Sequence, residues 1–137
     1  MKPLRIYLAG AMTSSHPITF LDNLRKGMRA TAELIVYGDG RYAVFSPFID
    51  FSIFFQLREG EQITVDMIKA QSMAWLEVSD CVLVLPEWGE SQGTIAEIKR
   101  AHELKIPVFF NRGQLDAHDL QLRRQESAGG GMAYVEQ

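Results

Sequence analysis

The chain has 137 residues, 47% of them hydrophobic and 23% charged, which is typical of one soluble globular domain. Its 14 basic and 17 acidic residues give a formal net charge of −3, which argues against a nucleic-acid polymer or an anionic membrane as partner and favours a small molecule. The apolar runs are too short for a membrane span, the first ten residues resemble a strand rather than a leader, and one cysteine excludes an internal disulfide, so we expect a cytoplasmic protein.

Short apolar runs alternate along the chain with segments of helical spacing. Strands are predicted over residues 4–9, 42–46, 80–85 and 107–111. Apolar positions recur every three or four residues over 20–35, which predicts a first helix that Gly38 and Gly40 end. Further helices are predicted over 63–78, about 93–105 and 115–126. Residues 127–131 resemble a Gly-rich hinge, and 132–137 a disordered tail or a small edge strand.

This alternation of strand and helix predicts an α/β domain with a parallel sheet. We expect a doubly wound, flavodoxin-like sheet of four or five strands with helices on both faces, formed by residues 1–126, with 127–137 as hinge and tail. Such sheets bind ligands beyond the carboxyl ends of their strands. The loops over 10–17, 46–61 and 86–93 are therefore the places to search for a site.

The start of the third helix carries the strongest candidate. Thr94 and Glu97 have the spacing of a capping box, in which Glu97 would serve only to begin the helix. A helical wheel favours another interpretation, because Glu97 lies beside the apolar positions Ala101 and Leu104 and away from the charged arc. An inward carboxylate in the first turn is expected to stay ionised, which makes Glu97 a candidate nucleophile.

Other candidates have competing structural interpretations. Tyr7 would fill the core or approach the ligand edge, and Asp80 would begin a strand, cap the preceding helix or serve the site. His16 is either exposed or an anion ligand, and Cys81 reads as a small buried strand residue. A group of aromatic residues would pack in the core, form a subunit interface or stack on a flat ligand; it comprises Phe45, Phe48, Phe51, Phe54 and Phe55.

Several motifs in order along residues 4–111 resemble the nucleoside 2-deoxyribosyltransferase superfamily. They are Tyr7-Leu8-Ala9-Gly10, Ser46-Pro47, Trp75-Leu76, Ser79-Asp80, Ser91-x-Gly93-Thr94-x-x-Glu97 and Pro107-Val108. Within that superfamily the chain looks closer to the nucleoside 5'-monophosphate N-hydrolases. The resemblance implies that Glu97 attacks the anomeric carbon, that Asp80 engages the substrate and helps to protonate the leaving base, and that Tyr7 orients the nucleophile.

The position six residues before the nucleophile bears on the substrate. Transferases of the superfamily carry there an aspartate that holds the sugar 5'-hydroxyl, whereas this chain has Ser91. A carboxylate would repel a 5'-phosphate and a serine hydroxyl beside helix N–H groups would accept it, so Ser91 favours a nucleotide. Two departures stand out: Ala96 replaces a frequent aromatic residue, and the loop after the first strand lacks the arginine of the hydrolases. Ser14, Ser15, His16 or Arg25 would then contact the phosphate.

We therefore expect an enzyme that hydrolyses the N-glycosidic bond of a (deoxy)nucleoside 5'-monophosphate and releases free base and sugar 5-phosphate. The alternatives are a nucleoside 2-deoxyribosyltransferase that exchanges bases and a non-catalytic nucleotide-binding sensor. No metal or cofactor is expected, and the resemblance implies a homodimer or a larger homo-oligomer. The predicted catalytic residues are Glu97, Asp80 and Tyr7, and the predicted substrate-binding residues are Gly10, Ser14, Ser15, His16, Ser91, Gly93 and Thr94.

Overall fold

The computed structural model describes residues 2–49 and 52–136 and contains a four-stranded parallel sheet. The strands are β1 (Leu4–Ala9), β2 (Tyr42–Phe45), β3 (Cys81–Val84) and β4 (Val108–Phe109), in the spatial order β2-β1-β3-β4. Tyr7 pairs with Phe45 on one side and with Val82 on the other. All four predicted strands are present, and the predicted α/β fold class is confirmed.

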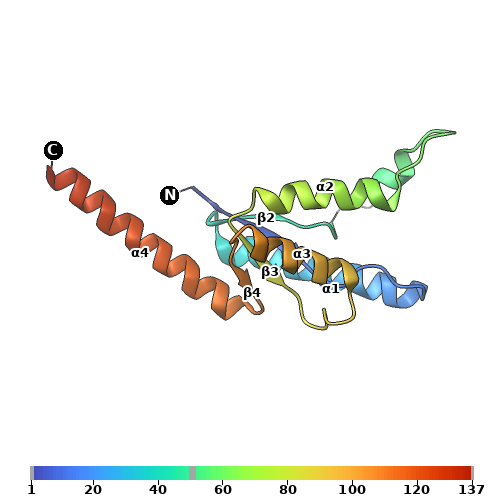
Figure 1. Cartoon of the computed structure of the whole chain (residues 1–137), viewed down its shortest axis with the longest axis horizontal. Helices are drawn as coiled ribbons and strands as arrows, with labels where there is room; N and C mark the ends of the chain where they lie inside the picture. Colours follow the sequence, from blue (N-terminus) through green and yellow to red (C-terminus); the bar gives the residue numbers. More distant parts are fainter. Residues whose placement is uncertain (1, 50–51, 137) are drawn as a thin grey trace.

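Helices connect the strands, with α1 and α4 on one face of the sheet and α2 and α3 on the other (Figure 1). Their bounds are α1 (Pro17–Gly38), α2 (Val65–Glu77), α3 (Gln92–Glu103) and α4 (Arg112–Glu136), and a short 3₁₀ helix, η1 (Ser52–Gln56), precedes α2. The chain moves outward from β1 to β2 and returns past β1 to β3. The carboxyl ends of β1 and β3 are therefore the switch point at which such sheets bind ligands.

Strand alternation divides the core into two layers. Ile6 and Leu8 of β1 pack with α1 and α4 through Leu24, Leu34 and Leu115. Tyr7 and Ala9 point to the other face and pack with Leu76 of α2 and with Ile98 and Ala101 of α3. Because every second residue of a strand points to the same face, this division places Tyr7 on the side of α2 and α3.

Local signals explain where α1 begins and ends. Pro17 is its first residue, a position at which proline has no hydrogen bond to lose. The helix ends as predicted at Gly38, and Asp39 follows in the left-handed conformation with its N–H donating to the Ile35 carbonyl. Gly38 also lies against Tyr42, because an added Cβ would approach the tyrosine ring to 2.9 Å.

The C-terminal segment differs from the prediction. Residues 127–131, predicted as a hinge, and 132–136, predicted as a tail or edge strand, continue α4 as one helix to Glu136. Figure 1 shows this helix leaving the sheet and extending away from the rest of the chain. Glycine costs a helix about 1 kcal/mol relative to alanine, which weakens a helix without ending it. Residue 137 lies outside the described residues.

Candidate functional site

The start of α3 differs from the predicted capping box. Ser91 is the N-cap, and its Oγ accepts hydrogen bonds from the Thr94 backbone N–H at 3.2 Å and from Thr94 Oγ1 at 2.9 Å. The interpretation of Thr94 as the cap, with Glu97 reaching back to it, is therefore wrong. The cap lies three residues earlier, and this leaves the side chain of Glu97 free for another role.

Glu97 points toward the sheet, as the helical wheel predicted. The residue is partly buried, and its Oε2 is wholly buried with no hydrogen-bond partner among the described residues. Ile98 and Ala101 on the same helix belong to the core layer that contains Tyr7. An unpartnered buried carboxyl oxygen is costly to maintain, and such groups frequently mark sites where a ligand supplies the missing partner.

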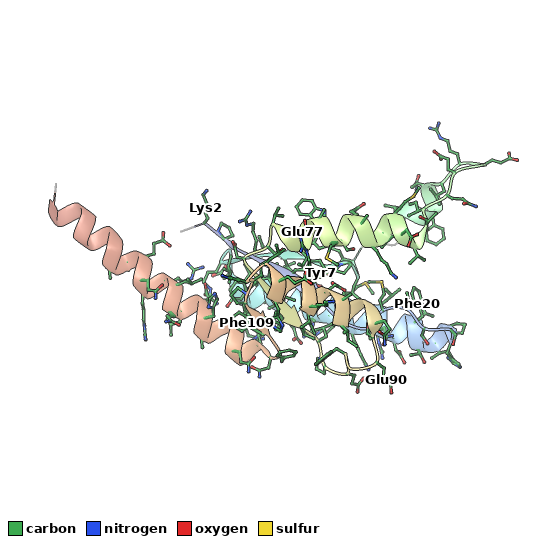
Figure 2. All side chains as sticks on the ribbon, viewed as in Figure 1. Lys2, Tyr7, Phe20, Glu77, Glu90 and Phe109 are labelled. Carbon is green, nitrogen blue, oxygen red and sulfur yellow. The ribbon has the colours of Figure 1, made fainter. Side chains whose placement is uncertain are left out.

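Tyr7 and Ser72 adjoin this carboxyl group. The Tyr7 hydroxyl is hydrogen-bonded to the Glu97 carboxyl and to the Ser72 hydroxyl on α2. Tyrosine has one proton to donate, so donation to Glu97 leaves the phenolic oxygen to accept from Ser72. Tyr7 is 1% exposed, and Figure 2 shows it in the centre of the molecule. The structure thus brings together Glu97 and Tyr7, two of the three predicted catalytic residues.

Sequence reasoning missed Ser72. The available signal was its place on the apolar side of the second predicted helix, one turn from Leu76 and Trp75. A small polar residue on a face that packs against a sheet needs a hydrogen-bond partner there. That rule would have singled out Ser72, although it could not have named Tyr7 as the partner.

Aromatic rings extend this polar group toward the surface. The Tyr7 and Phe45 rings stack with centroids 5.5 Å apart, and Phe45 stacks on Trp75 at 5.4 Å. Of the other predicted aromatic residues, Phe48 is buried against Gly27 in the opposite layer, and Phe55 is 87% exposed. Phe54 is partly buried, and Phe51 lies outside the described residues. The predicted aromatic group is therefore dispersed, with Phe45 stacked against Tyr7 and Phe48 in the opposite layer.

The protonation state of Glu97 differs from the prediction. Burial raises the pKa of Glu97 to about 7, and the hydrogen bond from Tyr7 opposes this rise. Burial and the negative charge of Glu97 also raise the pKa of Tyr7, which keeps its hydroxyl protonated. The prediction of a carboxylate kept ionised by the helix start did not include this burial, and Ser91 as N-cap places Glu97 beyond the first turn, where the effect of the helix start fades.

Asp80 lies elsewhere. It precedes β3, and its Oδ2 accepts a hydrogen bond from the Arg5 backbone N–H at 2.8 Å while Oδ1 pairs with Arg5 Nη2 at 3.1 Å. Burial works to raise the pKa of Asp80, but the hydrogen bonds and charge of Arg5 outweigh it and hold the pKa below its ordinary value. These contacts are at the amino ends of β1 and β3. The structure therefore does not bring Asp80 together with Glu97.

The predicted binding residues lie in the loops at the carboxyl edge. Gly10 follows β1, and an added Cβ there would approach Leu85 to 3.0 Å. The Ser14 hydroxyl accepts a hydrogen bond from the His16 backbone N–H, and His16 is the N-cap residue of α1, with an exposed side chain that makes no capping hydrogen bond. Ser15 is exposed as well, and Gly93 in the first turn of α3 faces open space.

A cleft of about 720 Å³ lies on the other face of the same edge. Its walls are α1, Ala11 after β1, and the loop after β3, and they include Arg25, which the sequence suggested as a phosphate ligand.

In residues 2–49 and 52–136, His, Cys, Asp and Glu side chains do not gather in groups of three that could hold a metal ion. Within the same residues no helix has the length and apolar character needed to cross a membrane.

Comparison with known proteins identifies a family. The model of the family described as "Domain of unknown function (DUF4406)" matches residues 4–110. The chain belongs to this family. No curated protein matches the sequence. Among solved structures, a 2-deoxyribosyltransferase from the psychrotolerant bacterium Bacillus psychrosaccharolyticus is similar, with a TM-score of 0.52 and 21% identity over 76% of this chain and 69% of that one. This DUF4406 chain and that enzyme thus share the α/β fold.

Proposed function

We propose that this DUF4406 protein hydrolyses the N-glycosidic bond of a (deoxy)nucleoside 5'-monophosphate, with Glu97 as the nucleophile. One observation carries the proposal: a buried carboxyl group at the switch point, bound by Tyr7 and with Oε2 unpartnered. The fold shared with a 2-deoxyribosyltransferase supports chemistry on the same kind of bond. No cofactor is required for this reaction.

The proposed reaction has two steps. The ionised Glu97 carboxylate attacks the anomeric carbon, the bond from that carbon to the base nitrogen breaks, and the base leaves with a proton from solvent. Water then attacks the same carbon, which releases the sugar 5-phosphate and restores the carboxylate. Tyr7 holds the carboxyl group in place through its hydroxyl. Asp80, which is paired with Arg5, has no part in this scheme.

The preference for a monophosphate depends on the start of α3. Ser91 accepts hydrogen bonds from Thr94, so its own hydroxyl proton remains available to a phosphate oxygen. Free N–H groups of the first helical turn and the open space beside Gly93 would receive the same anion. A carboxylate in place of Ser91 would repel it. Gly10, Ser14, Ser15 and His16, in the facing loop, complete the proposed binding site.

The direct test is base release by the Glu97→Gln protein. Each of the common ribonucleoside and deoxyribonucleoside 5'-monophosphates is incubated with the full chain, and free base is measured by chromatography. We expect Glu97→Gln to lower kcat by about 10³-fold or more, because it removes the nucleophile. Glu90→Gln, on the exposed loop before α3 (Figure 2), is the matched control and should leave turnover unchanged. Near-normal turnover in Glu97→Gln would falsify the proposal.

Base exchange is the second candidate function, and the similarity to a solved 2-deoxyribosyltransferase favours it. In that reaction a second free base, rather than water, attacks the glycosyl-enzyme intermediate. Incubation with a deoxynucleoside and a different free base separates the two functions. Formation of the exchanged nucleoside would identify a transferase. Release of base from monophosphates without exchange would identify a hydrolase.

We also propose that the protein is a homo-oligomer. Large apolar side chains are exposed on η1 and the first turn of α2, with Phe55 at 87%, Val65 at 60% and Met67 at 57%. Exposed apolar surface of this kind is typical of protein interfaces. Light scattering during size-exclusion chromatography should give the mass of two or more chains, and Phe55→Asp should lower it. A single-chain mass for the unaltered protein would contradict this proposal.

A further inference from the structure

The cleft on the α1 face has features of a binding site apart from Glu97. Its volume of about 720 Å³ lies within the range of small-molecule sites. Ala11, Leu85 and Pro86, at the carboxyl ends of β1 and β3, line part of it. Glu97 belongs with the layer on the opposite face of the sheet, so the cleft is not simply the surroundings of that carboxyl group.

Three cationic side chains of α1 line one wall of the cleft. Arg25, Lys26 and Arg29 lie within five consecutive residues, in a chain whose net charge is −3. Residues four apart share a helix face, so Arg25 and Arg29 project to the same side and Lys26 lies beside them. The lining also includes the carboxylates of Glu33 and Glu87, so the cleft carries a small excess of positive charge next to an apolar surface. This combination suits a molecule with an anionic end and an apolar body.

Each of the three cations has a weak carboxylate partner. Arg25 pairs with Asp22 at 3.2 Å, Lys26 with Glu87 at 3.3 Å and Arg29 with Glu33 at 3.1 Å. The cationic side chains are 60% to 77% exposed. Exposed ion pairs contribute little stability because water screens them. An anion with several oxygens can therefore replace these partners without disturbing the fold.

We propose that this cleft binds the phosphate group of a phosphorylated organic molecule of nucleotide size. Lys26 and Arg29 would hold the phosphate, and the organic part would lie against Leu85 and Pro86. The inference depends on the composition of the cleft and not on reaction at Glu97. It applies equally to a substrate that extends across the sheet edge and to a second ligand that binds apart from the substrate.

The ion pair between Glu87 and Lys26 allows a specific test of the proposal. Its carboxylate joins the loop after β3 to Lys26 on α1, and its backbone has a φ of 65°, which is uncommon for a residue other than glycine. A phosphate would compete with Glu87 for Lys26. Removing the Glu87 charge should therefore strengthen phosphate binding, whereas removing the Lys26 and Arg29 charges should weaken it. A purely structural ion pair would not produce opposite effects on binding.

The test is calorimetric titration of the full-length Glu97→Gln chain, which prevents turnover if Glu97 is the nucleophile. The probes are the four deoxynucleoside 5'-monophosphates, their nucleosides and inorganic phosphate. For a monophosphate that binds, we expect the added pair of substitutions Lys26→Gln and Arg29→Gln to weaken binding about tenfold or more. Glu87→Gln should strengthen it about threefold. Lys99→Gln, which removes one positive charge from α3 on the opposite face of the sheet, is the control and should change nothing.

The possible results are distinguishable from those of the base-release assay. Weaker binding of a monophosphate, with its nucleoside unaffected, supports the cleft even if the protein releases no base. Binding of inorganic phosphate alone, with no gain from the organic part, contradicts a nucleotide-sized ligand. Equal binding in the Lys26 and Arg29 variant, or no binding of any monophosphate at millimolar concentration, overturns the proposal and leaves the function of Glu97 open to its own test.

Discussion

Two buried carboxyl groups, one on each face of the sheet, have opposite surroundings. Asp119 on α4 is fully buried, and its oxygens accept hydrogen bonds from Arg123 Nε at 3.0 and 3.1 Å and from Arg41 Nη1 at 3.3 Å. Among the residues that the structure describes, Glu97 on α3 has no cationic partner of this kind, and its Oε2 lacks any hydrogen bond. Charge pairing makes the first group part of the fold. Its absence leaves the second available for chemistry, and two substitutions can test that contrast.

Asp119→Ala should give the largest loss of stability. Removing one partner of a buried ion pair leaves the other charge uncompensated, which typically costs 3 to 5 kcal/mol. Arg41 and Arg123 keep partial access to solvent, so we expect a loss of about 3 kcal/mol in the free energy of unfolding. Urea unfolding followed by circular dichroism measures it. Asp116, on the same helix as Asp119, accepts a hydrogen bond from the Tyr42 hydroxyl. Asp116→Ala should lower the free energy of unfolding less than Asp119→Ala does. Equal losses would contradict a special role for Asp119.

Glu97→Gln should act in the opposite direction and stabilise the protein at neutral or higher pH. The pKa of Glu97 is about 7 in the folded chain against an ordinary value of 4.5, so the folded state favours the protonated form. The stability due to that proton is complete below about pH 4.5 and is lost as the pH rises to about 7. The rise in the pKa of Glu97 limits the change in the free energy of unfolding to about 3 kcal/mol. We therefore expect Glu97→Gln to raise the free energy of unfolding by about 2 kcal/mol at pH 8, and this gain should disappear near pH 4.5.

Thermal unfolding at several pH values measures this gain. Glu90→Gln serves as the control, since its carboxyl group is exposed, and it should leave the unfolding temperature unchanged. If Glu97→Gln were destabilising at pH 8, the carboxylate would be a structural group like Asp119. The contrast between the two carboxyl groups would then be lost.

These two residues also show what sequence can and cannot predict. The inward direction of Glu97 follows from helix periodicity, and the α/β fold class follows from the alternation of apolar runs with helical segments, so both were predicted correctly. The unpaired state of Glu97 depends on how α2 and α3 settle on the sheet, which no local pattern specifies. Its raised pKa was missed for that reason, since burial depends on neighbours from three elements.

Asp80 and Ser91 illustrate two different limits. A residue that begins a parallel strand lies at the amino edge of the sheet, opposite to the ligand edge, so the position of Asp80 could have been read from the sequence. The N-cap was harder, because Ser91 and Thr94 are both good caps and their order depends on the backbone of the loop. The helical state of residues 127–136 depends on continuation from α4 through three consecutive glycines, which propensity alone does not favour.

Tyr7→Phe sharpens the comparison by removing the hydrogen bond that Glu97 does have. That hydrogen bond lowers the pKa of Glu97, so its loss should raise the pKa further above 7. For the unaltered protein we expect kcat/KM to rise as the pH increases through about 7, because the proposed nucleophile is the carboxylate. Tyr7→Phe should shift this rise to higher pH and lower kcat at neutral pH about tenfold. A profile that falls with increasing pH would instead identify Glu97 as a general acid.

Ser72→Ala should have the smallest effect, because it acts on Glu97 only through Tyr7. The substitution removes the hydroxyl group that binds the Tyr7 oxygen, and a neutral hydrogen bond contributes about 1 kcal/mol. We expect kcat to fall about threefold with KM unchanged, as the tyrosine loses part of its orientation. Ser72→Thr, which keeps the hydroxyl, should restore the rate. If kcat falls equally in Tyr7→Phe and in the double variant Tyr7→Phe with Ser72→Ala, then Ser72 acts through Tyr7. If the two decreases in kcat are additive, Ser72 has an independent role.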